Sequence, residues 1–233
     1  MCAHSRAITA PETKLAVPIP VLVDGIETVW AKRSKIGMTA VGIRRNENAS
    51  SIGIILPIDE IDLAKFDNRE KGYTRIFLDI ENVNLVPFLT AERYAAKSHD
   101  VLLNAKDQKK DEFVRIWTYM PEIFAPANAE YPIVQSYVDT ILRGCLDTGG
   151  EEFADEFIRR TKGWDPEELS DPFNADSNAE VSAQSTFWVE DRGDPVYTRG
   201  DPFHSQSNAE TFDNLLQRGC PLAFLKRRAV RKA

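Results

Sequence analysis

Short apolar runs rich in β-branched residues alternate with polar turns along the first half of the chain, a pattern typical of strands. Four such runs are Leu15–Val23, Ile26–Ala31, Met38–Arg44 and Ser51–Pro57. The polar residues Arg45 to Ser50 predict the loop of a hairpin between the last two runs. Glycines inside or beside these runs predict bulges or tight curvature, as in a small barrel.

The next stretch predicts a short helix between strands. Residues 59–68 have an acidic start and apolar positions at helical spacing. Tyr73–Ile80 alternates in part between polar and apolar residues, as a half-buried strand does, and Phe113–Met120 predicts a further strand. The polar stretch Thr90–Glu112 between them predicts a helix and loop over the surface.

Helices follow in the second half. Apolar residues recur at helical spacing over Ile133–Leu146, Gly149–Gly150 predicts the end of that helix, and a second helix is predicted over Glu151–Lys162. Two Ser-Asn-Ala-Glu capping boxes predict helix starts near Asn178 and Asn208. Because strands come first and helices later, we expect an α+β fold, with a small, strongly curved mixed or antiparallel β-barrel and helices packed on it.

The composition changes after Trp164, where turn-forming residues become frequent. We therefore predict one domain over residues 1–163 and a C-terminal extension of helices and loops over residues 164–233. A chain of 233 residues has the length for one domain plus such an appendage.

Charge and cysteine content narrow the classes of function. The formal net charge is −7, and the only basic run is Lys226–Lys232, which argues against nucleic acid as a partner. No segment reaches the roughly 18 consecutive apolar residues of a membrane span. The three cysteines, Cys2, Cys145 and Cys220, are scattered and show no metal-binding spacing, so we expect a cytoplasmic protein without a bound metal.

Three segments carry a resemblance to a known family. They are Gly53–Tyr73, which ends in Asp-Asn-Arg-Glu-Lys-Gly-Tyr, Val114–Tyr119, and Pro132–Cys145 with its Pro-x-x-x-x-Tyr start. In order and spacing they resemble the gamma-glutamylcyclotransferase superfamily. The resemblance implies an enzyme without a cofactor that acts on a small-molecule gamma-glutamyl substrate.

The implied reaction is an intramolecular attack of the substrate's α-amine on its own γ-carbonyl, which forms 5-oxoproline and releases an amine. The resemblance implies that Glu70 is the general acid/base, for which we expect partial shielding from water. Tyr73, Tyr119 and Tyr137 are candidate substrate-binding residues. Each of the three is equally well explained as a half-buried aromatic.

One departure from the family leaves two readings open. The family's Tyr-Gly-Ser loop, whose backbone N–H groups hold the gamma-glutamyl moiety, has no match here. We expect a truncated start, because the loss of a first central strand would expose a sheet edge. The alternative is a non-catalytic binding module on the same fold. A related cyclase or transferase that acts on a biosynthetic intermediate fits the same residues.

Overall fold

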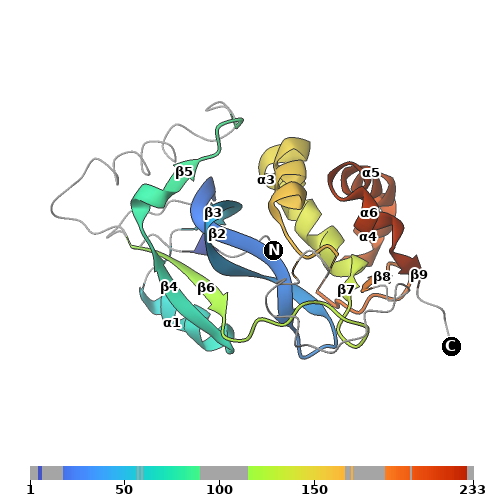
Figure 1. Cartoon of the computed structure of the whole chain (residues 1–233), viewed down its shortest axis with the longest axis horizontal. Helices are drawn as coiled ribbons and strands as arrows, with labels where there is room; N and C mark the ends of the chain where they lie inside the picture. Colours follow the sequence, from blue (N-terminus) through green and yellow to red (C-terminus); the bar gives the residue numbers. More distant parts are fainter. Residues whose placement is uncertain are drawn as a thin grey trace.

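The computed structural model describes residues 5–6, 18–56, 58, 60–89, 115–165, 169, 187–199 and 201–229. The described residues form an α+β fold with antiparallel sheets and several helices, as the sequence predicts. Figure 1 shows the long strands β2 and β3 between a β4–β6 layer on one side and the helices α3, α4, α5 and α6 on the other.

A long antiparallel hairpin of β2 (Ile19–Arg33) and β3 (Thr39–Ile55) forms the centre of the fold. Its tight connection is at residues 34–38, where Gly37 has a φ of +77°. The hairpin loop predicted at Arg45–Ser50 is wrong, because these residues lie inside β3. At Gly25, also at a φ of +77°, the register jumps, so that Ser50 lies opposite Asp24 but Arg45 lies opposite Ile26. Residues 46–49 are the extra residues of this irregularity.

The second antiparallel sheet has the order β1 (Ser5–Arg6), β6 (Ile116–Pro121) and β4 (Tyr73–Leu78). The predicted short helix is present as α1 (Glu60–Arg69) and leads into β4. A 3₁₀ turn at residues 80–82 then leads into β5 (Val83–Leu85), which pairs with β2. The predicted helix and loop at residues 90–112 lie outside the described residues.

The strands that the structure describes form three separate three-stranded sheets, and no closed barrel is found among them. The third sheet is small and parallel. It joins β7 (Ile133–Val134), β8 (Trp188–Glu190) and β9 (Arg228–Ala229). The pairing of β7 with β8 places the residues that follow position 187 beside the start of the long helix that begins at Gln135.

That helix is α3 (Gln135–Arg160), and it is interrupted at Gly150, which has a φ of +73° and a ψ of −163°. The two helices predicted on either side of Gly149–Gly150 are therefore confirmed as two segments. The later helices are α4 (Pro202–Ser207), α5 (Ala209–Gly219) and α6 (Pro221–Leu225). The start of α5 agrees with the prediction at Asn208, whereas the one at Asn178 lies outside the described residues. No helix in the described ranges is long and apolar enough to cross a membrane.

Helix α3 packs on β2, β3 and α5, and the largest hydrophobic cluster lies between these elements. Cys145 is fully buried in it, as its place on the apolar stripe predicts. The cluster also contains Trp188 and Phe212, so residues beyond position 187 share one core with α3. The predicted boundary between residues 163 and 164 stays a prediction.

Candidate functional site

A cavity of about 220 Å³ opens between the β2–β3 hairpin, the end of α1 and the first turn of α3. All four residues singled out in the sequence, Glu70, Tyr73, Tyr119 and Tyr137, line it. We call this cavity the tyrosine pocket. They come from the end of α1, from β4, from β6 and from α3, so the fold gathers at one place residues that are up to 67 positions apart (137 − 70). Their roles in chemistry stay predictions.

Glu70 is held by the turn that follows α1. Its backbone N–H donates to the Phe66 carbonyl at 2.9 Å, and its carbonyl accepts from the Tyr73 N–H at 3.1 Å. Gly72, at a φ of +83°, allows this tight turn because it has no side chain. The Lys32 ammonium donates to the Gly72 carbonyl at 2.8 Å and so ties the turn to β2. The backbone at Glu70 is therefore fixed from two sides.

The Glu70 side chain is 19% exposed and forms an ion pair with its neighbour Arg69, which is 39% exposed. Arg69 donates from Nε and Nη2 to the same oxygen, Glu70 Oε1, at 2.9 and 2.6 Å. Within the described part of the chain, no hydrogen bond to Glu70 Oε2 is found. The expected shielding from water is present, and one carboxylate oxygen has capacity to bind a donor.

Tyr73 lies beside this carboxylate, with the Lys32 ammonium 4.7 Å from its ring centre. Burial raises the pKa of Tyr73 to about 12, and the negative charge of Glu70 acts in the same direction. The hydroxyl group therefore remains protonated at neutral pH and is available as a hydrogen-bond donor.

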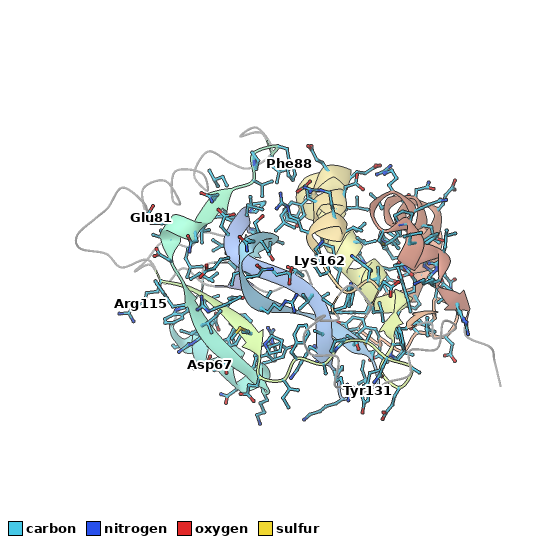
Figure 2. The ribbon with its side chains drawn as sticks, in the orientation of Figure 1. Asp67, Glu81, Phe88, Arg115, Tyr131 and Lys162 are labelled. Carbon is cyan, nitrogen blue, oxygen red and sulfur yellow. The ribbon has the colours of Figure 1, made fainter. Side chains whose placement is uncertain are left out.

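Tyr119 is buried, and its hydroxyl group donates to Asp67 Oδ1 at 2.8 Å. Figure 2 labels Asp67 on α1, close to β4 and β6. Burial raises the pKa of Tyr119, and the hydrogen bond to Asp67 raises it further. Arg75 holds Asp67 from the other side at 3.1 Å. Because the proton of Tyr119 is already donated, its oxygen is available to a ligand as an acceptor.

Tyr137 packs edge-on against Trp30, with ring centres 5.9 Å apart, and in a tilted arrangement against Tyr197, with ring centres 4.8 Å apart. Tyr197 and Arg199 also line the pocket, and sequence reasoning missed both. They follow Tyr137 by 60 residues or more, in a stretch that reads as turns. No local signal in that stretch points to this site, since only the contact with α3 brings it there.

The search for metal-binding groups and the comparisons with known proteins add nothing to the geometry of the described residues. No group of three or more His, Cys, Asp or Glu side chains that could hold a metal is found among the residues that the structure describes. Comparisons with family models, curated proteins and solved structures found no match to this chain. The gamma-glutamylcyclotransferase resemblance stays a hypothesis that rests on the residues themselves.

Proposed function

We propose that the chain is a gamma-glutamylcyclotransferase-like enzyme that cyclises a gamma-glutamyl amine or peptide to 5-oxoproline. The observation that carries the proposal is the gathering of Glu70, Tyr73, Tyr119 and Tyr137 around one cavity. These residues belong to three separate segments of the sequence, Gly53–Tyr73, Val114–Tyr119 and Pro132–Cys145. Their convergence on one pocket supports a site for a small molecule.

In the proposed reaction, the substrate's α-nitrogen forms a bond to its own γ-carbonyl carbon, and the bond from that carbon to the leaving nitrogen breaks. Glu70 accepts the proton that the attacking amine loses and returns it to the leaving amine, so no net proton is gained or lost. Oε2 is the oxygen suited to this role, because Arg69 occupies Oε1. Attack within one molecule needs little more than a fixed, folded substrate conformer.

The aromatic walls of the pocket are suited to holding the substrate in a folded conformer. Tyr73 supplies a hydroxyl donor, Tyr119 an acceptor oxygen, and Tyr137 a packed ring face beside Trp30. The proposal includes the family's curved barrel, which the contacts of β3 with β6 and with β1 favour. It also includes a cytoplasmic location, favoured by the few, scattered cysteines.

The test measures 5-oxoproline release from gamma-glutamyl peptides and gamma-glutamyl amines by the intact chain and by Glu70→Gln. Loss of a general acid/base lowers turnover by about 10²- to 10⁴-fold. Glu47→Gln, an exposed carboxylate on β3, is the matched control and keeps full activity. Unchanged release by Glu70→Gln would exclude the acid/base role.

The second candidate is a non-catalytic binding module on the same fold. The ion pair between Arg69 and Glu70 favours it, because the ion pair gives the carboxylate a structural partner within the chain. Gamma-glutamyl compounds that bind to the intact chain but release no 5-oxoproline would support this module. Binding and turnover together support the enzyme.

A further inference from the structure

One wall of the tyrosine pocket comes from the C-terminal third of the chain. Residues 191–199 leave β8 and run past the first turn of α3, where Tyr197 and Arg199 reach the cavity. The Tyr197 ring lies 4.8 Å from the Tyr137 ring, at an angle of 58° between the planes. The two aromatic rings together make a wall that continues from α3 to this segment.

The position of this segment is set by Asp191, which is buried and bonded to α3. Its Oδ1 accepts from the Ser136 N–H at 2.7 Å, and its Oδ2 accepts from the Ser136 hydroxyl at 2.6 Å. The N–H of Val196 also donates to Asp191 Oδ2, at 2.8 Å. The N–H of Tyr197 donates to the Ser136 oxygen at 3.1 Å. Ser136 precedes Tyr137 directly, so one short part of α3 positions both tyrosines of the wall.

Arg199 brings a positive charge to the rim of the pocket. Its side chain is exposed, and among the described residues no acidic partner for it is found. The other charged residues that line the cavity, Arg69 and Glu70, form a pair and largely cancel each other. The described lining therefore has a net positive charge, and Arg199 is its source.

We propose that Arg199, beside the Tyr137–Tyr197 wall, binds a carboxylate on the leaving half of the ligand. The ligand is then a gamma-glutamyl amino acid or peptide with a free carboxylate, and a neutral gamma-glutamyl amine is a poorer ligand. This assignment rests on the proposed function for the identity of the gamma-glutamyl half. A guanidinium is suited to the role because its planar donors match the two oxygens of a carboxylate.

The size of the effect follows from the exposure of Arg199. A charge-assisted hydrogen bond to a desolvated carboxylate changes affinity tenfold or more, whereas a fully exposed ion pair changes it only a few-fold. At the rim of a pocket we expect roughly a five- to tenfold preference. Because the site is open to solvent, added salt reduces that preference.

The test compares gamma-glutamylglycine with gamma-glutamylglycinamide, which differ by one negative charge at the same length. Affinities are measured by calorimetry on the Arg69→Gln/Glu70→Gln chain, which does not consume the ligands and, like the intact ion pair, adds no net charge to the pocket. The same measurement is made after adding Arg199→Gln, or Arg45→Gln as the control, since Arg45 is an exposed arginine on β3 that does not line the pocket. Thermal unfolding of each variant checks that it is folded.

The expected result is a five- to tenfold preference for the acid that Arg199→Gln removes and Arg45→Gln preserves. Equal affinities, absence of binding by both ligands, or a preference that survives Arg199→Gln would overturn the assignment. Turnover by the chain with Glu70 intact is measured separately. A binding preference without any 5-oxoproline release contradicts the proposed function but leaves the role of Arg199 in place.

Discussion

The tyrosine pocket differs from a second group of charged residues in how exposed its charges are and in how fully they are paired. In the pocket, Arg69 and Glu70 form one ion pair that is partly open to water, with side chains 39% and 19% exposed. The second group of charged residues, Asp139, Glu190, Arg192, Asp213 and Arg227, forms a charge network whose centre is buried. There Arg192 is 9% exposed, and its partner Asp139 is fully buried.

Each donor and acceptor at the centre of the network is matched. Arg192 donates from Nε and Nη2 to Asp139 at 2.6 and 3.0 Å, and from Nη2 also to Asp213 at 2.8 Å. Arg227 donates to both oxygens of Asp213 at 3.0 Å. Gln135 donates to Asp139 at 2.7 Å. Such a network has little remaining capacity for a ligand, whereas Glu70 Oε2 and Arg199 have it.

The pKa values reflect the same contrast. Burial works to raise the pKa of Asp213, but hydrogen bonds from Arg227 and Arg192 outweigh it, and the pKa is lowered. Burial raises the pKa of Asp139, and the two hydrogen bonds from Arg192 oppose that rise. The arginines of the network therefore act against burial and favour the charged form of both carboxylates. From this difference we expect the network to contribute mainly to stability and the pocket to be the place where a ligand binds.

The largest effect is expected from Arg192→Met, which removes the cation and leaves Asp139 buried without it. Loss of one partner of a buried pair costs about 3–5 kcal/mol, and denaturant unfolding measures this change. Arg159→Met is the matched control, because Arg159 is an exposed arginine of α3 paired with Glu156. Its change is expected to be about 0–1 kcal/mol. Equal losses in both variants would contradict the contrast.

The loss of unfolding free energy in Arg192→Met should also depend on pH. Without Arg192, the burial that raises the pKa of Asp139 is still opposed by the hydrogen bond from Gln135 but no longer by a guanidinium. An acid whose folded-state pKa is raised stabilises the protein at a pH below its unfolded pKa, and that contribution is lost as the pH rises through the folded pKa. The deficit of Arg192→Met relative to the wild type should therefore shrink on acidification from neutral pH. A deficit that grows instead would show that Asp139 is not the destabilising group.

Ser136→Ala should have the next largest effect, because Ser136 holds Asp191 and Tyr197 against α3. It removes the hydroxyl group that donates to Asp191 and accepts from the Tyr197 N–H. Leaving these buried groups underbonded costs about 1–3 kcal/mol of unfolding free energy. Affinity for gamma-glutamylglycine should fall as well, since Arg199 loses its fixed position. A loss of stability without a loss of affinity would mean that other contacts position the wall.

Tyr119→Phe should have a smaller effect. It removes one hydrogen bond to Asp67, whose carboxylate keeps its ion pair with Arg75. The expected loss is about 0.5–1.5 kcal/mol of unfolding free energy. Phe77→Tyr, at a half-exposed position on the neighbouring strand, is a control for adding or removing one hydroxyl group. No loss in Tyr119→Phe would show that the bond to Asp67 adds nothing to folding.

Glu70→Gln should have the smallest effect on stability and a large one on turnover. Its ion pair with Arg69 is partly exposed, and such pairs contribute about 0–1 kcal/mol. Denaturant unfolding and 5-oxoproline release on the same preparation separate the two readouts. A loss near that of Arg192→Met would make Glu70 a structural residue, and the contrast between the regions would fail.

The local spacing of apolar, polar and glycine residues was sufficient to predict many elements of this fold. Helix α1, strands β4 and β6 and the break of α3 at Gly150 all follow from residue spacing and from glycine. The prediction failed at Arg45–Ser50, where a polar run looks like a loop. There Arg44 and Asn46 donate to Glu27 on β2, so a partner strand 17 and more residues away keeps the polar run in β3.

The amino-acid sequence by itself determined most of the strands and helices and which carboxylate and tyrosines are candidates for chemistry, because spacing and residue type act over a few positions. Only the tertiary structure decided that these residues share a pocket, that Arg69 pairs with Glu70, and that Tyr197 and Arg199 complete the wall. Those outcomes depend on contacts between segments tens of residues apart. Asp191 with Ser136 is one such contact, made across 55 positions, and no local pattern encodes it.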